Sequence, residues 1–318
     1  MPKTRRPRRG SMAFYPRKRS KRIYPNVRTW VDVKETKPLG FTGFKAGMTH
    51  ILLIDSNPHS TTKGQEITSP ITILDCPPLS VFGFRCYTGK KSSFDVFSDK
   101  LDKKLSRKMK LSKTPKKVEE QLKKIPEKID KITLLCHTNP SFKKKPETFE
   151  VPIGGQIEEQ VKYAKEILGK EIKISDVFKE GDMIDVVGIT KGKGFQGEVK
   201  RFGVKVLGRK AQKMQRHTGA HGTKEPGKVR HTVPQPGQLG YQRRTEVNKR
   251  IVKIESGFEM KGGFVGYGTI DGDSVLIQGS VPGPKKRLIF MRFATRQKKV
   301  YPIDIKYISK ESKQGARR

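Results

Sequence analysis

A long segment, residues 191–250, limits most strongly how this chain can fold, because it has the pattern of no regular structure. It holds sixteen Lys or Arg residues against three acids, Glu198, Glu225 and Glu246. Nine glycines and prolines between positions 208 and 240 exclude a long helix, and the few apolar residues follow neither a strand period nor a helix period. Such a segment has no core of its own, so we expect it to become ordered by whatever neutralises its charge.

The whole chain is strongly basic, which limits the kinds of partner that it can have. Its 318 residues contain 69 Lys or Arg against 31 Asp or Glu, which gives a formal net charge of +38. Self-repulsion of this size disfavours a compact free protein and favours a polyanionic partner such as nucleic acid. A membrane surface would instead require an amphipathic basic helix or an apolar anchor, and the sequence has the pattern of neither. We therefore expect no membrane partner.

Residues 1–36 form a second basic segment. Residues 1–28 contain eleven Lys or Arg and no acid, and prolines at positions 2, 7, 16 and 25 separate them. An organellar transit peptide is also basic, but it must form an amphipathic helix, which these prolines interrupt. The sequence therefore predicts a basic N-terminal extension that is not a targeting signal.

The cysteines and histidines do not have the spacing of a disulfide framework or a metal site. Cys76, Cys86 and Cys136 are odd in number and contain no CxxC pair, which favours a reducing cytosol. His217 and His221 are four residues apart, but the glycines around them argue against the helix that would aim both at one ion. We expect these imidazoles to contact RNA or solvent, and we expect no metal.

Outside the basic segments the sequence predicts a mainly β protein with an insertion. Short β-branched and aromatic runs occur in residues 37–98 and again in 172–318, the second range including the 191–250 loop. About seven to nine such strands favour a β-barrel, closed so that no strand edge is left free. Residues 99–171 alternate helical and strand patterns, which predicts an inserted α/β lobe.

Within the lobe three stretches have helical patterns, and residues 131–138 have the pattern of a strand. The helical stretches are residues 102–111, 114–125 and 155–170. Thr114 is suited to be the N-cap of the second, with Pro115 in its first turn. In the third, apolar residues at positions 157, 161, 164, 167 and 168 fall on one face. The lysines of residues 99–124 suit a solvated face and an RNA contact equally.

In the second β part, residues 182–190 predict a strand, and residues 262–281 predict a hairpin that turns at 271–273. The glycines at 192–197 match the letters of a dinucleotide-binding loop. That loop needs a following helix and an acid about 20 residues further on. Glycines at 197, 203 and 208 interrupt any such helix, and residues 212–220 contain no acid. We therefore expect no cofactor and, since no catalytic motif occurs elsewhere, no enzyme.

Arginine, glycine, glutamine and aromatic residues are interleaved in both basic segments. The aromatic residues are Phe14, Tyr15, Tyr24 and Trp30 in the first, and Phe195, Phe202 and Tyr241 in the second. The guanidinium groups of arginine pair with phosphates, and the faces of aromatic side chains stack on unpaired bases. The mixture therefore favours RNA over duplex DNA.

Four motifs in this order resemble a known family. They are "GFKAGMT" (43–49), "GITKGKGFQGEVKRFGVK" (188–205), "HTVPQPGQLGYQRRTEVNKRI" (231–251) and "GSVPGPKKRL" (279–288). They are similar to the universal large-subunit ribosomal protein three family, in its archaeal and eukaryotic form. The resemblance implies a translation-factor-like β-barrel on large-subunit rRNA, neighbouring ribosomal proteins as partners, and no small-molecule substrate. It also implies an early role in assembly and a loop that extends towards the peptidyl-transferase centre.

The resemblance places Lys191, Lys193, Lys200 and Arg201 at the root of the loop and residues 209–228 at its tip. Related chains carry a Trp near the tip, whereas here Lys224 precedes Glu225 and Pro226, and Trp30 is the only Trp. The residues that we expect to contact rRNA are Arg5, Arg6, Arg8, Arg9, Arg17, Lys18, Arg19, Lys191, Lys193, Lys200, Arg201, Arg209, Lys210, Lys213, Arg216, His217, His221, Lys224, Lys228, Arg230, His231, Gln235, Gln238, Tyr241, Arg243, Arg244, Lys249 and Arg250.

Two other functions are consistent with parts of the sequence. An RNA-processing enzyme or a translational regulator could also present a basic loop from a β-barrel. A nucleotide-dependent oxidoreductase is supported only by the glycines at 192–197.

Overall fold

The computed structural model describes residues 7–112, 117–126, 128–211, 213–219, 221, 227–297 and 299–311. The chain divides into two compact units, each built from two separate parts of the sequence. We call Tyr24–Gly188 with Thr245–Arg318 the core unit, and Met1–Ile23 with Ile189–Arg244 the extension unit. The two basic segments of the sequence thus contribute to one unit.

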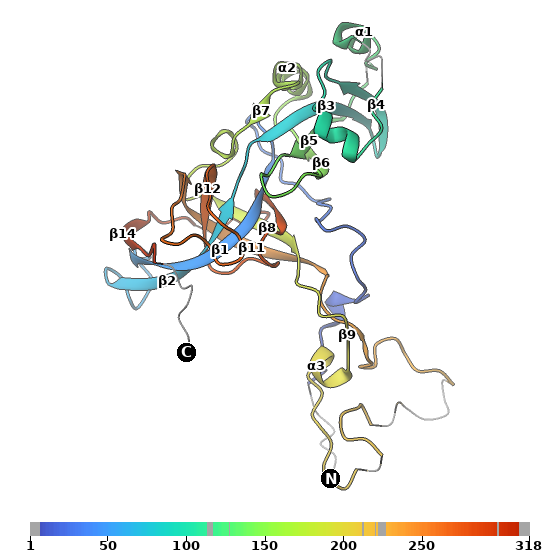
Figure 1. Ribbon diagram of the computed structural model, residues 1–318, viewed down its shortest axis with the longest axis vertical. Helices are drawn as coiled ribbons and strands as arrows, with labels where there is room; N and C mark the ends of the chain where they lie inside the picture. The colour runs from blue at the N-terminus through green and yellow to red at the C-terminus, as the bar shows by residue number, and fades with distance from the viewer. Residues whose placement is uncertain are drawn as a thin grey trace. The chain divides into compact units, whose positions relative to one another are not determined.

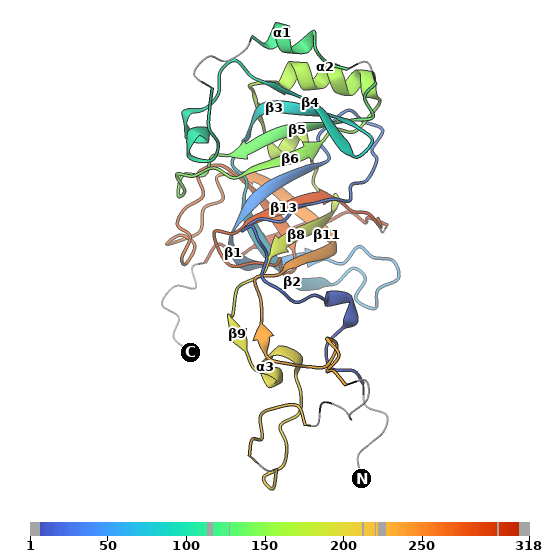
Figure 2. The same ribbon diagram turned by 90° about the vertical axis from the view of Figure 1, so that its right-hand side faces the viewer.

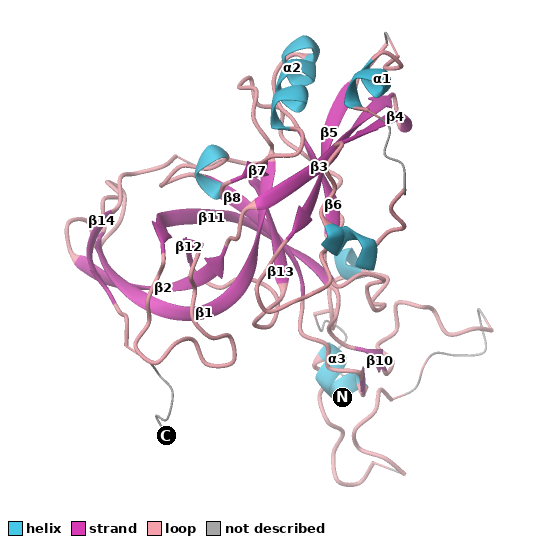
Figure 3. Ribbon diagram, turned by 45° about the horizontal axis from the view of Figure 1, so that its top comes forward, coloured by secondary structure: helices cyan, strands magenta, loops and turns pink. Residues whose placement is uncertain are grey.

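The core unit contains a seven-stranded antiparallel sheet (Figures 1 and 3). Its order is β13-β8-β11-β12-β2-β1-β14, and β13 also pairs with β1, so the pairings of six strands return to their starting point. The strands are β1 (Gly40–Ile54), β2 (Glu66–Asp75), β8 (Met183–Ile189), β11 (Arg243–Ser256), β12 (Asp273–Gln278), β13 (Leu288–Phe293) and β14 (Asp304–Ile308). The prediction of a mainly β protein is confirmed.

β1 reaches three neighbours because it is long and irregular. Its first residues, Gly40–Phe44, pair with β13, its last residues, Ile51–Ile54, pair with β14, and β2 lies along its other edge. The register shifts between Lys45 and Gly47, within the "GFKAGMT" motif. A Cβ on Gly47 would lie 2.5 Å from the Phe264 ring, so glycine leaves room for a buried aromatic side chain.

The predicted hairpin over residues 262–281 is wrong in its first half. β12 forms, but residues 262–270 contain no strand and only an isolated bridge between Phe264 and Gly268. Glycines 262, 263, 266 and 268 all have positive φ, which coils this segment instead of extending it. Phe264 and Ile270 are buried against Ile71 and Ile73 of β2, so the segment caps a core cluster.

A second sheet in the core unit carries the helices. Its order is β4-β3-β5-β6, and the short β7 also pairs with β3. The strands are β3 (Leu79–Thr88), β4 (Lys91–Phe97), β5 (Lys131–Thr138), β6 (Thr148–Pro152) and β7 (Glu171–Ile172). The strand predicted at 131–138 is confirmed. β3 and β4 precede residues 99–171, so the sheet of this lobe draws on strands before the predicted insertion.

The helices of the lobe are shorter than their patterns (Figure 2). α2 (Ile157–Ile167) buries Ala164 as predicted, but Ile157 at its start remains 40% exposed. α1 covers only Val118–Leu122 and begins at an N-cap Lys117 that makes no side-chain hydrogen bond. The predicted N-cap Thr114 and Pro115 lie outside the described residues. Residues 102–111 form only a 3-10 helix, η2 (Lys103–Arg107).

Two aromatic residues of the N-terminal segment belong to the core unit. Tyr24 is buried, and Trp30 packs edge to face on Phe290 of β13, with ring centroids 5.8 Å apart. Tyr24 therefore cannot stack on an unpaired base as predicted, whereas Trp30 is half-buried and has one edge or face packed on Phe290.

Candidate nucleic-acid interface

The extension unit concentrates the positive charge of the chain. Its sequence contains 24 Lys or Arg and two acids, which is a formal net charge of +22 out of +38. One acid, Glu225, lies outside the described residues. The other, Glu198, is buried, and its Oε2 accepts a hydrogen bond of 2.7 Å from the Thr218 amide. The described surface of this unit therefore has almost no negative charge of its own.

The loop begins as an antiparallel ladder. The Thr190 amide donates to the Gln242 carbonyl (3.0 Å), the Lys193 amide donates to the Leu239 carbonyl (3.0 Å), and the Leu239 amide donates to the Gly194 carbonyl (2.9 Å). β9 (Phe195–Gln196) then pairs with β10 (Gly237–Gln238). The backbones approach so closely that a Cβ on Gly240 would lie 2.1 Å from the Lys191 carbonyl oxygen.

A short helix follows the glycine motif, contrary to the expectation that glycines would prevent one. α3 covers Glu198–Phe202 and ends at Gly203, which has a φ of +66° and donates its amide to the Val199 carbonyl. Gly197 and Gly203 thus bound the helix instead of interrupting it. Its five residues are far shorter than the helix of a dinucleotide-binding loop.

Phe202 is the centre of a small core in this unit. It is 8% exposed, and the Arg17 guanidinium carbon lies 4.4 Å from its ring centroid. The Arg201 guanidinium carbon lies 5.1 Å from the same centroid, and Tyr15 stacks at 6.4 Å. Phe202 therefore cannot stack on a base as predicted. Residues 191–250 do not form this small core on their own, because Arg17 and Tyr15 of the N-terminal segment contribute to it.

Arg201 connects three parts of the unit. Its Nε donates to the Gln238 carbonyl (3.1 Å), one Nη donates to the Gln235 carbonyl (2.8 Å), and the other donates to the Arg17 carbonyl (3.3 Å). Burial, and then the like charge of Arg17, lower the pKa of the Arg201 guanidinium. This arginine joins α3 to the N-terminal segment and to the last part of the loop, residues 232–244, which we call the returning limb.

The N-terminal segment lies along the returning limb at several points. Arg8 donates to the Thr232 carbonyl (2.6 Å), and the Ser20 amide donates to the Tyr241 carbonyl (2.8 Å). The Arg244 guanidinium carbon lies 4.5 Å from the Phe14 ring centroid. Residues more than 220 positions apart in the sequence are thus held together by arginine, carbonyl and aromatic groups.

The predicted rRNA-contacting residues differ in their solvent exposure. Those with exposed side chains are Arg8, Arg9, Lys18, Arg19, Lys191, Lys193, Lys200, Arg209, Lys210, Lys213, Arg216, His221, Lys228, Arg230, His231, Gln235 and Arg243. Those partly buried are Arg17, Arg201, His217, Gln238, Tyr241 and Arg244 in the extension unit, and Lys249 and Arg250 in the core unit. Arg5, Arg6 and Lys224 lie outside the described residues.

Sequence reasoning missed three exposed cations of the same unit, Lys21, Arg22 and Lys205. They lie in the two basic segments, so counting every cation of those segments would have included them.

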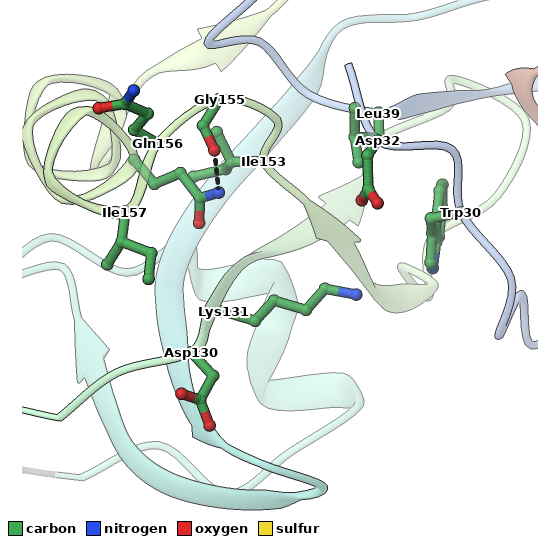
Figure 4. A pocket seen from close by; sticks show the side chains of 10 residues that line it. Trp30, Asp32, Leu39, Asp130, Lys131, Ile153, Gly155, Gln156 and Ile157 are labelled. Atoms are coloured by element: carbon green, nitrogen blue, oxygen red, sulfur yellow. Dashed lines mark hydrogen bonds between the residues drawn. The ribbon is translucent and has the colours of Figure 1, made fainter. Parts of the chain in front are cut away.

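The core unit contains a pocket of about 480 Å³ between the N-terminal segment, β5 and the start of α2 (Figure 4). Trp30, Asp32 and Lys131 line it, and the side chain of Gln160 donates to the Gly155 carbonyl (2.9 Å) at its wall.

Among the described residues of the chain, no group of three or more His, Cys, Asp or Glu could hold a metal ion. None of the described helices is long and apolar enough to cross a membrane.

Comparison with known proteins identifies the family. The family model described as ribosomal protein L3 matches residues 1–315. The large ribosomal subunit protein uL3 of Methanocaldococcus jannaschii is 48% identical, over 98% of this chain and 98% of its own length. The uL3 proteins of Methanococcus aeolicus and Picrophilus torridus are each 45% identical, over 98% and 97% of this chain and 99% and 98% of their own lengths. The chain belongs to the ribosomal protein L3 family, a family of structural ribosomal proteins and not of enzymes.

Proposed function

We propose that the chain is a structural constituent of the large subunit of the cytoplasmic ribosome and binds large-subunit rRNA mainly through its extension unit. The observation that carries this proposal is the charge of that unit, 24 Lys or Arg against two acids, with the one described carboxylate buried. Only a partner with dense negative charge offsets the repulsion among so many cations, and the phosphate backbone of RNA has this property.

The core unit would be the rigid part of the protein that anchors it in the subunit. The ring of pairings through β1, β2, β12, β11, β8 and β13 supports a closed, translation-factor-like barrel. A barrel leaves few free strand edges, so it can hold the ends of a long loop at a fixed separation. The inserted lobe would then be available to neighbouring ribosomal proteins.

The tip of the loop, residues 209–228, would extend towards the peptidyl-transferase centre. Family membership supports this placement, and so do the exposed side chains of Arg209, Lys213 and Arg216. The residues 224–226, where related chains carry a Trp, lie outside the described residues. Because binding of this kind bridges and neutralises rRNA helices, we also propose that the protein acts early in subunit assembly.

Sedimentation of a cell lysate tests the proposal. We expect the chain to sediment with large subunits at low and moderate salt and to be released only at high salt, because its contacts are mainly electrostatic. A chain found mainly free and at low copy number would contradict the proposed function.

A further inference from the structure

Phe195 is the most exposed large apolar side chain in the described part of the chain. It is 76% exposed, whereas the next, Met214, is 58% exposed. It lies in the glycine motif at the root of the loop, on β9. Covering so exposed a phenyl ring with an apolar partner from outside the chain would be favourable, because it would remove apolar surface from water.

The backbone around this ring is fixed. Phe195 pairs with Gln238, and the next residue, Gln196, pairs with Gly237. The side-chain amide of Gln196 donates to the Lys193 carbonyl (2.7 Å), and the Gly194 carbonyl accepts the Leu239 amide (2.9 Å). The exposure of the ring therefore does not come from a frayed end of the chain.

Other aromatic side chains of the extension unit already have partners. Phe202 is enclosed by Arg17 and Tyr15, and Phe14, which is 49% exposed, has the Arg244 guanidinium on one side of its ring. No aromatic ring or cation among the described residues is in stacking contact with Phe195. Phe195 is thus the most exposed aromatic side chain among the described residues of this unit.

The surroundings of the ring indicate the chemistry of its partner. Lys191, Lys193 and Lys200 are exposed along the same stretch of chain, and no acid but the buried Glu198 occurs between them. If the partner of Phe195 were an apolar pocket on another protein, the several exposed lysines near the ring would have no role in the contact. A single-stranded nucleic acid combines a flat apolar base with phosphates on either side, whereas the bases of a duplex are covered by their neighbours.

We infer that the Phe195 ring stacks on one unpaired base of the large-subunit rRNA, while lysines close to it in the sequence neutralise the flanking phosphates. This inference rests on the proposed function, because it assigns a contact within the proposed rRNA interface. In this arrangement, the two-strand ladder at the glycine motif holds the Phe195 ring in place for the base.

Full-length variants separate the aromatic face from the apolar bulk of the side chain. Phe195→Ala removes both, Phe195→Leu keeps only the bulk, and Phe195→Trp keeps the face. Tyr307→Ala is the matched control, because Tyr307 is an exposed aromatic residue (47%) on β14 of the core unit. Affinity for refolded full-length large-subunit rRNA is measured by filter retention between 50 and 200 mM salt.

We expect Phe195→Ala to weaken binding by about 5- to 140-fold, which is the usual effect of losing one stacked base. Phe195→Leu should lose most of the same affinity, and Phe195→Trp should stay within about threefold of the unchanged protein. The slope of log affinity against log salt should not change in these variants, since stacking releases no counterion. Lys193→Gln should instead reduce that slope by about 0.7 to 0.9.

Several results would overturn the inference and leave the proposed function standing. These are full affinity in the Ala variant, full affinity in the Leu variant, or an equal loss in the Tyr307 control. Full affinity for rRNA combined with depletion of Phe195→Ala from assembled subunits would show that the ring contacts a protein neighbour. If the unchanged protein does not bind rRNA, the proposed function and this inference fail together.

Discussion

Removing exposed charge from the loop should change the salt dependence of rRNA binding by a predictable amount. Arg209, Lys210, Lys213 and Arg216 are all exposed, and replacing the four with Gln removes four charges without touching the Phe202 core. Each phosphate contact contributes about 0.7 to 0.9 to the slope of log affinity against log salt. If each residue meets one phosphate, the slope becomes shallower by roughly 3. Between 50 and 200 mM salt, the affinity advantage of the unchanged protein should therefore shrink about 60-fold.

A matched variant tests whether this effect belongs to the extension unit. Lys63, Lys91, Lys162 and Lys165 are exposed in the core unit, and replacing them with Gln removes the same number of charges. We expect the slope to change by less than about 1 in this control, again measured by filter retention. Equal changes of slope in the two variants would refute the reasoning, because binding would then depend on total charge and not on the extension unit.

Three further predictions follow from individual contacts. Arg201→Ala should increase amide hydrogen exchange at residues 235–244 at least about tenfold in the free protein, since the carbonyls of Gln235, Pro236 and Gln238 lose a charged donor; unchanged exchange would argue against this structural role. Arg292→Met should lower the free energy of unfolding by about 3–5 kcal/mol in urea titrations, because Asp185, fully buried, loses the cation 3.0 Å away; a loss below about 1 kcal/mol would contradict this account. Limited proteolysis of the free protein should cut within residues 203–234 before it cuts the ladder at 190–196, and assembled subunits should protect both; equal cleavage in the two states would count against ordering by RNA.

Local sequence patterns predicted correctly a strand in which nearly all side chains are buried. Residues 131–138 are mostly apolar or β-branched, and β5 covers the same range because nearly all of it is buried. Residues 262–270 also contain aromatic and β-branched residues, but four glycines with positive φ coil them around Phe264. Sequence shows that a glycine is present but not which sign its φ takes, so the hairpin could not be distinguished from this coil.

The candidate site was predicted in its charge but not in its internal contacts. The count of cations indicated a polyanionic partner, because composition alone determines net charge, and the interleaved arginine, glycine, glutamine and aromatic residues favoured RNA. The burial of Phe202 depends on Arg17 and Tyr15, which lie more than 180 residues earlier in the sequence. No local pattern contains such a contact, so Phe202 and Phe195 appeared equivalent until their surroundings were known.

The way in which the extension unit is held together preserves its charge. Its three partly buried cations, Arg17, Arg201 and Arg244, are all arginines, while all its described lysines are exposed. A guanidinium is flat and weakly hydrated, so it can donate to carbonyls and stack on rings at a lower cost of desolvation than an ammonium group. Carbonyls and rings carry no net charge, so contacts of this kind bind the two basic segments together without cancelling a single cation. An extension joined by ion pairs would need one acid for each link and would present correspondingly less charge to RNA.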